Sequence, residues 1–377
     1  MKIIEGIYSS AVVFTTENSE NAIDDYAAAQ IKMICDNEVS KGCKIRIMPD
    51  VHPGKVGTIG LTMTVGKKIL PNLVGIDIGC GMMLAKIKQK KIEYQKLDTV
   101  IREGIPSGSG IRKTPHHYRD RIHLEELCCY RSIRTNKAEA SLGILGGGNH
   151  FIEVDKDVEG NLYVILHSGS RHLGKEVTEY YLARGQKVLR QKGEDVPFEL
   201  TYLEGEVMED YLHDLQIVQD YAEINRASML DVLCKGMKWK VEETITSIHN
   251  YVEESEMGRI LRKGAVSARA GEKVIIPVNM RDGVILAEGL GNEEWNDSAP
   301  HGAGRIVKRA DACSSYTVSD FKAVMKGIHC SCINKDTLDE APFAYRRLED
   351  IQQVISETVR SMQVLRPVYN YKAGGKQ

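Results

Sequence analysis

The sequence of 377 residues predicts an α+β fold. Helical and strand-like patterns of apolar residues both occur along the chain, and they do not alternate in the strict order of a βαβ protein. Apolar residues make up 42% of the chain and charged residues 27%, which is an ordinary globular composition. No low-complexity linker or regular repeat divides the sequence, so we expect residues 1–377 to form a single domain.

Charge and cysteine usage exclude several classes of protein. Nine cysteines are scattered without a CxxC pair, which argues against a disulfide framework and against a zinc finger or ribbon. The formal net charge of -2 gives no overall attraction to nucleic acid, so a polyanion must be bound by a local patch. The N-terminus lacks the layout of a signal peptide, and no run reaches the ~18 apolar residues of a membrane span. We expect a cytoplasmic protein with no membrane partner.

The first half of the chain predicts one helix and then a series of short strands. Residues 20–36 have apolar residues at helical spacing after a polar cap at Asn18, Ser19 or Asn21. Between Lys44 and Lys88 the pattern changes to β-prone runs separated by Gly and Pro. We expect strands at 45–47, 58–65, 73–78, 82–87 and 162–166, the last of which leads directly into His167.

The second half predicts a long helix, a hairpin and a C-terminal helix. Residues 205–235 carry apolar residues near helical spacing and stop at Gly236. Residues 273–278 and 283–287 indicate a hairpin. After a capping-box pattern at 337–340, an apolar stripe from Ile351 to Met362 predicts a helix that ends before Pro367.

Four histidines lie in settings rich in glycine or next to asparagine. One histidine of this kind is more often structural than a ligand, but four together favour a metal site. Asp77 and Cys80 add a carboxylate and a thiolate within the glycine-rich segment 75–81. Sulfur, oxygen and several imidazoles form a plausible set of ligands for two Mn²⁺, Zn²⁺ or Fe²⁺ ions, although the Asp-x-x-Cys spacing alone is weak evidence. The four histidines are His150, His167, His249 and His301.

Two arginines flank glycine-rich segments and permit two interpretations. Glycine exposes backbone N–H groups to a phosphate, and Arg171 or Arg305 could clasp that phosphate in a bidentate manner. The alternative is a pair of tight turns with surface arginines. Neither a Walker A motif nor a dinucleotide fingerprint is present.

Together the motifs resemble those of the RtcB-type RNA ligases, which join RNA ends using GTP and manganese. Their order and spacing fit that family over nearly the full chain. The resemblance implies a compact RtcB-like domain in which helices surround mixed β-sheets and a central cleft holds metal and nucleotide. The matching motifs are MPDVHPG (48–54), GIDIGCG (75–81), GGGNHFIE (146–153), HSGSR (167–171), IHN (248–250), RKGA (262–265), HGAGR (301–305), EAP (340–342) with Tyr345, and LRP (365–367) with Lys372.

The resemblance also implies a role for each candidate residue. Cys80 would bridge two Mn²⁺ ions, and His301 would attack the α-phosphate of GTP and carry GMP through a phosphorus–nitrogen bond. The other metal ligands would be Asp77, His150, His167 and His249. Asn149 would contact the GTP phosphates, Glu153, Tyr345 and Lys372 would hold the guanine and its ribose, and Arg171 and Arg305 would bind phosphates of the RNA or the nucleotide.

The implied activity is GTP- and Mn²⁺-dependent ligation of RNA 3′-phosphate or 2′,3′-cyclic phosphate ends to 5′-hydroxyl ends. The implied setting is RNA repair or tRNA splicing, with tRNA or rRNA fragments as substrates. A release-factor-like or archease-type protein is a further partner that the resemblance suggests. Two alternatives stay open: a binuclear metal phosphodiesterase or phosphatase that acts on RNA ends without His301, and a non-catalytic protein that binds RNA or nucleotide.

Three features outside the matching motifs also bear on function. His116 and His117 follow a basic segment that could contact RNA, although a solvated surface is the simpler interpretation. The sequence His329-Cys330-Ser331-Cys332 resembles a metal clip but is more typical of a buried strand. His172 stands where many relatives have glycine, and the segment 270–300 is unusual, so both depart from the family pattern.

Overall fold

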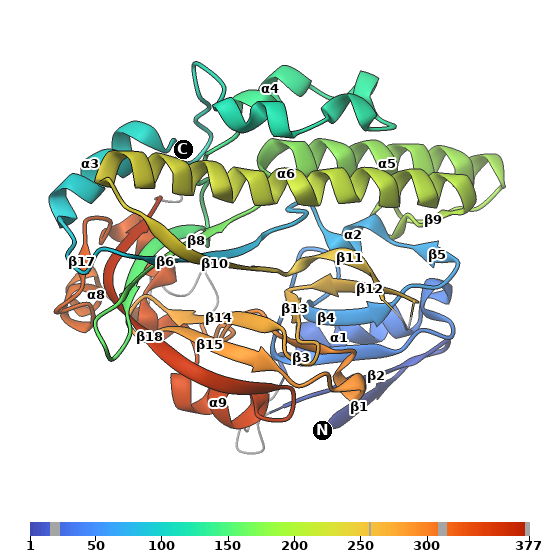
Figure 1. Ribbon diagram of the computed structural model, residues 1–377. Coiled ribbons are helices and arrows are strands. Elements are labelled where there is room, and N and C mark those ends of the chain that lie inside the picture. The colour runs from blue at the N-terminus through green and yellow to red at the C-terminus, as the bar shows by residue number, and fades with distance from the viewer. Residues whose placement is uncertain (16–22, 256–257, 308–314, 374–377) are drawn as a thin grey trace.

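The computed structural model describes residues 1–15, 23–255, 258–307 and 315–373. Within them, two large β-sheets lie below a pair of long helices (Figure 1). Each sheet contains both parallel and antiparallel neighbours, since β2 runs parallel to β3 and β17 runs parallel to β18. The α+β class and the mixed sheets are therefore as predicted.

The first sheet has six strands in the order β1-β2-β3-β4-β12-β11. Its strands are β1 (Lys2–Glu5), β2 (Ser10–Val13), β3 (Ile45–His52), β4 (Ile59–Thr64), β12 (Gly258–Lys263) and β11 (Asn250–Ser255).

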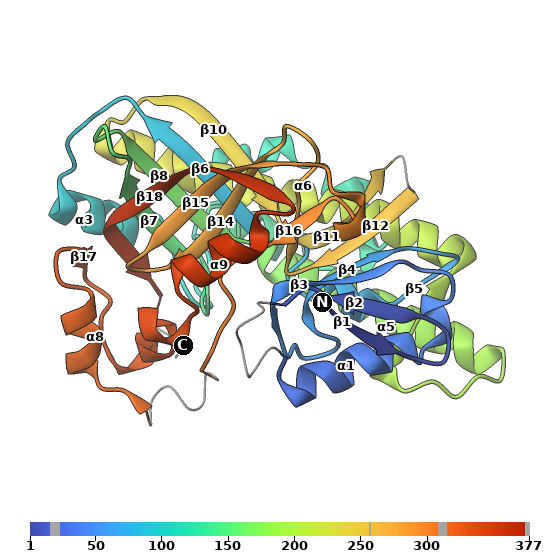
Figure 2. The same cartoon turned by 90° about the horizontal axis from the view of Figure 1, so that it is seen from below.

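The second sheet has the order β10-β6-β8-β7-β18-β15-β14, with β17 beside β18. It is strongly curved, and β18 follows that curve over its whole length (Figure 2). Its strands are β10 (Val241–Ile248), β6 (Gly81–Ile87), β8 (Leu162–Ser168), β7 (Phe151–Lys156), β18 (Val359–Lys372), β15 (Gly283–Gly289), β14 (Lys273–Asn279) and β17 (His329–Cys330). Two short pairs complete the strands, β5 (Lys68–Ile69) with β9 (Leu203–Glu204) and β13 (Ala265–Ser267) with β16 (Ser298–Pro300).

Helices α5 (Arg171–Gln191) and α6 (Gly205–Met237) lie side by side over the sheets (Figure 1). One apolar core lies between these helices and the first sheet. In a second core, the C-terminal half of α6 packs on the second sheet. The other α-helices in the part of the chain that the structure describes are α1 (Asp25–Cys35), α2 (Pro71–Val74), α3 (Tyr94–Gly104), α4 (Thr135–Ala140), α8 (Val318–Val324) and α9 (Leu348–Ile355). No helix among the described residues is long and apolar enough to cross a membrane.

The structure corrects two of the predicted elements. The predicted strand 73–78 is wrong, because Pro71 starts the short helix α2 and Gly75, with φ of 91°, ends it. The predicted C-terminal helix ends at Ile355, and Val359 already belongs to β18. Pro367 lies inside that strand at an irregularity in the pairing with β7, where a missing N–H is tolerated.

The start of the first helix also differs from the prediction. Asp24 caps α1 by accepting hydrogen bonds from the N–H groups of Tyr26 and Ala27. The predicted caps Asn18, Ser19 and Asn21 lie outside the described residues. The long helix and the hairpin at 273–287 are confirmed, although α6 continues through Gly236 to Met237.

Candidate active site

Four predicted metal ligands meet at one edge of the second sheet. Strand β6 is antiparallel to its neighbours β10 and β8, and β7 is antiparallel to β8. The starts of β6 and β7 therefore lie beside the ends of β8 and β10. Cys80 precedes β6, His150 precedes β7, His167 is the penultimate residue of β8, and His249 follows β10.

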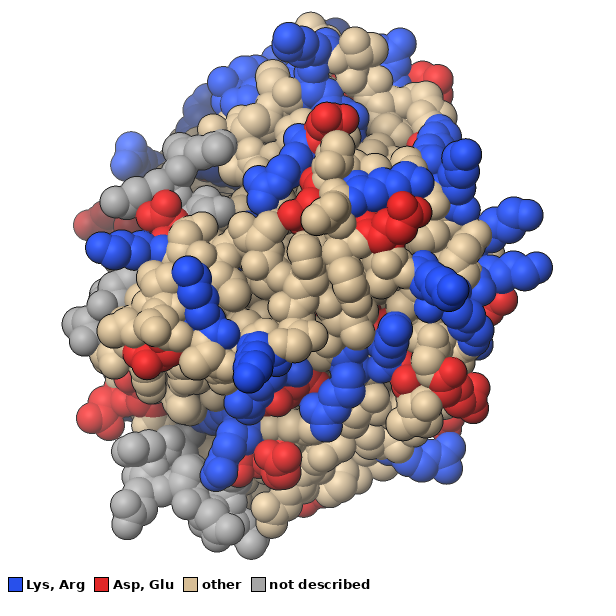
Figure 3. Space-filling model, turned by 90° about the vertical axis from the view of Figure 1, so that its left-hand side faces the viewer, with Lys and Arg blue, Asp and Glu red and all other residues tan. Residues whose placement is uncertain are grey.

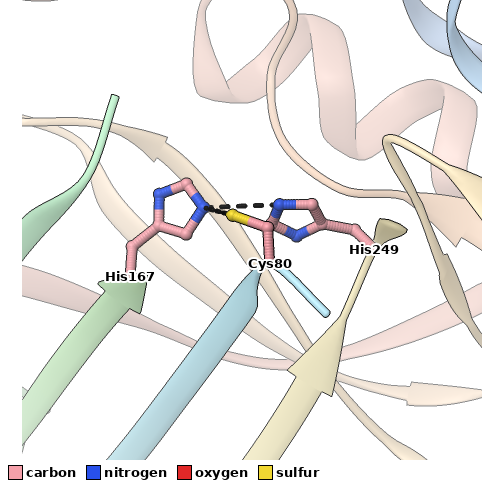
Figure 4. A group of neighbouring side chains, drawn as sticks. All are labelled: Cys80, His167 and His249. Carbon is pink, nitrogen blue, oxygen red and sulfur yellow. Dashed lines mark hydrogen bonds between the residues drawn. The ribbon is translucent and has the colours of Figure 1, made fainter. Parts of the chain in front are cut away.

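The side chains at this edge point toward one another (Figure 4). The Sγ atom of Cys80 lies 3.4 Å from Nε2 of both His150 and His167. Nε2 of His167 lies 3.4 Å from Nε2 of His249. Asp77 joins the group through an Oδ2 atom 3.0 Å from Nε2 of His150. All five predicted ligands thus form one cluster with Cys80 at its centre.

Hydrogen bonds on the outer side of the cluster orient the imidazole rings for metal binding. Nδ1 of His150 lies 3.0 Å from the carbonyl oxygen of Leu145, and Nδ1 of His167 lies 3.1 Å from that of Asn149. In His167 the carbonyl accepts the Nδ1 proton, which leaves the lone pair of Nε2 facing the cluster. Nδ1 of His150 also lies 3.0 Å from Nη1 of Arg171, and its Nε2 faces Cys80 and Asp77. The donor set of one thiolate, one carboxylate and three imidazoles therefore fits a divalent transition metal.

Burial sets the protonation of the cluster. It is the main cause that lowers the pKa values of His167 and His249, so both rings are neutral at pH 7. Burial opposes ionisation of Asp77, but the neighbouring His150 outweighs it and lowers the pKa of this carboxyl. In the absence of metal, burial and the Asp77 carboxylate raise the pKa of the Cys80 thiol. A dication at this position would favour the thiolate instead.

A cavity opens beside the cluster and has an empty volume of about 760 Å³, open solvent included. Five residues were predicted to contact the nucleotide, and all of them line the cavity: His301 and four others. His167 and Arg305 line it as well. The four other predicted contacts are Asn149, Glu153, Tyr345 and Lys372.

Glu340 organises one wall of this cavity, although sequence reasoning gave it no role. Its buried carboxylate accepts hydrogen bonds from Lys372 Nζ and from the Tyr345 hydroxyl, both at 2.6 Å. Arg305 donates to the Tyr345 hydroxyl at 3.2 Å and to the carbonyl oxygen of Asp339 at 2.6 Å. The motif EAP (340–342) was the available signal for Glu340.

Glu153 is a buried acid at the base of the cavity. Burial raises the pKa of its carboxyl to about 7, and Asn370 donates to it at 2.7 Å. Asp155 lies on the same face of β7, and burial together with Glu153 raises its pKa further. Two adjacent buried carboxyls disfavour being ionised together, and Glu153 gains the charge that accepts hydrogen bonds as pH rises through about 7.

His301 follows β16 and lies between the cavity and the metal cluster. Its ring centroid is 4.9 Å from that of His249. Nδ1 of His301 lies 2.7 Å from Oδ2 of Asp50, a side chain with no exposed surface. Asp50 was missed as a functional residue, even though it belongs to the motif MPDVHPG (48–54). The carboxylate holds the proton on Nδ1 and leaves Nε2 free to act as a nucleophile.

Two buried residues of helix α6 bind backbone groups close to the cluster, and sequence reasoning missed both of them. Asn225 accepts hydrogen bonds from the N–H groups of Gly143 and Ile144. Arg226 donates to the carbonyl oxygens of Gly79 and Ser168, which adjoin Cys80 and His167. The apolar spacing of α6 gave no indication of this role.

The two predicted phosphate-binding arginines occupy different places. Arg305 lines the cavity, whereas Nη1 of Arg171 lies 3.0 Å from Nδ1 of His150 on the other side of the cluster. Arg171 has a φ of 54°, which a non-glycine residue adopts at a cost. Its neighbour His172 is paired with Glu176 at 2.6 Å within α5.

Surface charge gives no uniform attraction for RNA. On the face drawn in Figure 3, Lys and Arg side chains stand among Asp, Glu and uncharged side chains. His116 is buried and bonded to Asp231 at 3.2 Å, while its neighbour His117 is exposed. Because the formal net charge of the chain is -2, RNA phosphates must be bound by a local patch and not by an overall attraction.

The chain is similar to proteins of known activity. Residues 37–129 and 123–373 match the family described as tRNA-splicing ligase RtcB. The chain is 33% identical to RNA-splicing ligase RtcB of Escherichia coli K12 over 363 residues, covering 86% of this chain and 88% of that protein. It is 28% identical to RNA-splicing ligase RtcB2 of another Escherichia coli strain, covering 98% of each chain. Its identity to tRNA-splicing ligase RtcB of Aeropyrum pernix is 25%, covering 82% of this chain and 83% of that protein.

Proposed function

This chain belongs to the RtcB family and is an RNA ligase that joins 3′-phosphate and 5′-hydroxyl RNA ends, and we propose that it does so with GTP and Mn²⁺ through a GMP adduct on His301. The observation that carries the proposal is the place of His301. Its ring is bonded to Asp50, adjoins the His/Cys cluster and faces a cavity that can hold a nucleotide.

We assign the metal site to the five clustered ligands, with Cys80 as the bridge between two ions. When bound there, Mn²⁺ supplies positive charge that neutralises the reacting phosphates and favours an in-line displacement. The ligands are Asp77, Cys80, His150, His167 and His249.

We assign the cavity to GTP. The ionised Glu153 carboxylate would accept hydrogen bonds from the N–H groups of the guanine base, which adenine does not present in the same arrangement. Tyr345 and Lys372, fixed by Glu340, would contact the ribose and the base edge. Asn149 lies between the cavity and His150 and would contact the phosphates.

The proposed reaction has three steps. Nε2 of His301 attacks the α-phosphorus of GTP, the phosphorus–nitrogen bond forms, and pyrophosphate leaves with the electron pair of the broken bond. Asp50 keeps the Nδ1 proton in place and stabilises the positive charge of the substituted ring. An oxygen of the RNA 3′-phosphate then displaces His301 and forms an RNA-ppG end. Finally the 5′-hydroxyl attacks the 3′-phosphorus, loses its proton, and releases GMP.

A 2′,3′-cyclic phosphate end would first be hydrolysed to a 3′-phosphate in the same site. Arg171 would bind RNA phosphate, and Arg305 would bind phosphate while supporting Tyr345. We further propose that residues 1–377 act as one ligase domain in the cytoplasm, on tRNA or rRNA fragments, with a release-factor-like or archease-type protein as a candidate partner.

The decisive experiment is intact-protein mass spectrometry after incubation with GTP and Mn²⁺, followed by peptide mapping. We expect an acid-labile GMP adduct on His301 that is absent from His301→Ala. If no adduct forms and His301→Ala still releases phosphate from RNA ends in the presence of metal, the mechanism through His301 is wrong and a phosphodiesterase is favoured.

A further inference from the structure

A pair of cysteines adjoins the wall of the nucleotide cavity. Cys330 is the last residue of β17, and Cys332 lies in the turn that follows. Their Sγ atoms are 3.2 Å apart, and both thiols are free. We propose that Cys330 and Cys332 form a reversible oxidation site, at which a hydroperoxide produces a disulfide that weakens nucleotide binding.

The geometry favours a bond between these two sulfurs. A disulfide has an S–S distance of about 2.05 Å, so the sulfurs need only a small approach, and one turn residue separates the cysteines. Cys332 is 5% exposed and Cys330 is half-buried, which admits an oxidant as small as a hydroperoxide.

The local hydrogen bonds also divide the chemical roles. The sulfurs of Cys330 and Cys332 lie within hydrogen-bond distance of each other, and the backbone N–H of Lys372 donates to the Cys332 sulfur at 3.2 Å. Both interactions lower the pKa of the Cys332 thiol, whereas the pKa of the Cys330 thiol is raised by its bond to Cys332. Cys332 is therefore the better nucleophile of the pair.

Hydrogen peroxide would oxidise the pair in two steps. The Cys332 thiolate attacks one oxygen of hydrogen peroxide, its O–O bond breaks, and Cys332 becomes a sulfenic acid while the other oxygen leaves as water. Cys330 then attacks the sulfenic sulfur, and the displaced hydroxyl leaves as a second water. Overall, two thiols are oxidised to one disulfide and one peroxide is reduced to two waters. A dithiol reductant reverses the change.

Three contacts connect this pair to the cavity. The Cys332 sulfur accepts the backbone N–H of Lys372, whose side chain bonds Glu340. The Cys332 carbonyl accepts the hydroxyl of Thr337 at 2.6 Å, in the turn of helix that carries Glu340. Cys330 pairs with Asn370, which donates to Glu153. Forming the disulfide removes the thiolate that accepts the N–H of Lys372 and shifts the Cys332 backbone. It therefore displaces Lys372 and Glu153, the two residues assigned to the guanine that these contacts reach.

The test is a titration of the metal-loaded protein with hydrogen peroxide, followed by alkylation and tryptic mapping. Lys326 and Lys335 flank the pair, so both cysteines fall in one peptide, 327–335. The reduced peptide gains two alkyl groups, whereas the disulfide form gains none and is two hydrogen atoms lighter than the unalkylated dithiol. In parallel, GTP affinity is measured by calorimetry for the wild type and for Cys330→Ser. Cys330→Ala serves as a second variant if the serine protein folds poorly, and Cys128→Ser, which removes an exposed thiol, is the matched control.

We expect the two-hydrogen loss in the wild type, its reversal by dithiothreitol, and GTP affinity that falls by roughly 3- to 10-fold, as the loss of one hydrogen bond implies. Cys330→Ser should keep its affinity under the same treatment, and Cys128→Ser should behave like the wild type. The proposal fails if peptide 327–335 stays reduced while Cys128 is oxidised, if the disulfide forms without a change in affinity, or if Cys330→Ser loses affinity equally.

Only the effect on GTP rests on the proposed function. If the reduced protein binds no GTP, the proposed use of the cavity is wrong, whereas the mass of peptide 327–335 still decides whether the pair is an oxidation site.

Discussion

The imidazole Nδ1 of His301 and the buried carboxylate of Asp50 are 2.7 Å apart, although 251 residues separate them in the chain. This bond fixes the tautomer of the proposed nucleophile and places a negative charge behind it. Asp50 does not belong to the metal cluster, so its contribution can be separated from that of the metals.

Asp50→Asn is expected to slow formation of the GMP adduct by roughly 10²–10⁴-fold, the range for a lost acid–base or tautomer-fixing partner. Single-turnover mass spectrometry of the adduct measures the rate. Metal content should stay at the wild-type level, and a variant that loses its metal would show instead that Asp50 acts through the cluster.

Cys80→Ser is expected to weaken Mn²⁺ binding by at least ~100-fold, because a serine hydroxyl replaces a thiolate at the centre of the cluster. Calorimetric titration of the metal-free protein provides the measurement. Cys129→Ser is the control, because Cys129 is equally buried but lies outside the cluster. Equal Mn²⁺ affinity in Cys80→Ser and the wild type would contradict the assigned bridge.

Arg226→Met is expected to lower both the free energy of unfolding and the affinity for Mn²⁺. The change leaves the carbonyl oxygens of Gly79 and Ser168 without their buried donor, at a cost of about 1–3 kcal/mol for each. Urea unfolding and metal titration test the two effects, and Arg226→Lys, which retains a donor and the charge, should fall between Arg226→Met and the wild type. If Arg226→Met binds Mn²⁺ as tightly as the wild type, Arg226 does not position the ligands.

GTP affinity is expected to rise as pH rises through about 7 and to level off above it, because the Glu153 carboxyl has a pKa of about 7 and accepts guanine N–H groups when it is ionised. Glu153→Gln should bind GTP more weakly and should lose this pH dependence. Calorimetry between pH 5.5 and 8.5, chosen to span the titration on both sides, measures the effect. A pH profile shared by both proteins would assign the titration to another group.

The same acid affects stability in the opposite sense. The ordinary pKa of glutamate is 4.5, so between about pH 4.5 and 7 the folded protein holds a proton that the unfolded chain has lost. The contribution of Glu153 to the free energy of unfolding therefore falls as pH rises through this window and is constant above it. Urea unfolding of the wild type and Glu153→Gln at several pH values should show this difference.

Arg171→Ala is expected to raise the KM for RNA by roughly 10- to 100-fold, the loss of one charge-assisted contact, and to leave the GMP adduct nearly unchanged. Arg171 lies on the His150 side of the cluster, whereas Arg305 supports Tyr345 in the cavity. Arg305→Ala should therefore reduce adduct formation. Loss of the GMP adduct in a fully metal-loaded Arg171→Ala protein would show that Arg171 acts in nucleotide transfer and not only in RNA binding.

The sequence predicted those parts of the fold whose signals are local. The predicted strand 162–166 is present as β8, which continues through His167 to Ser168, because a continuous β-prone run has one clear outcome. The prediction of a strand at 73–78 failed because the four apolar residues of this run fit a strand as well as a helical turn, and Pro71 favours the turn. Val359 and Met362 continued a helical stripe by coincidence. In the structure Val359 pairs with Gly289 of β15, and Met362 lies at an irregularity in the pairing of β18 with that strand.

The residues of the site also divide into those with a signal in the local sequence and those without one. Local composition and a family resemblance singled out the histidines and Cys80, which the structure brings together. Asp50 and Arg226 could not be assigned roles from spacing, because each acts through a partner more than 50 residues away that only the folded chain brings near. Their functional contacts are properties of the tertiary structure.

The cluster also joins distant parts of the chain. Its sulfur–nitrogen and nitrogen–nitrogen contacts connect residues that are 70, 87 and 82 positions apart. Closing loops of that length costs chain entropy, which the sheet must overcome before the ligands can meet. The site should consequently form late in folding and bind metal only in the native state. The melting temperature should then keep rising with the logarithm of the free metal concentration even after the site is saturated, and a chelator should reverse the rise.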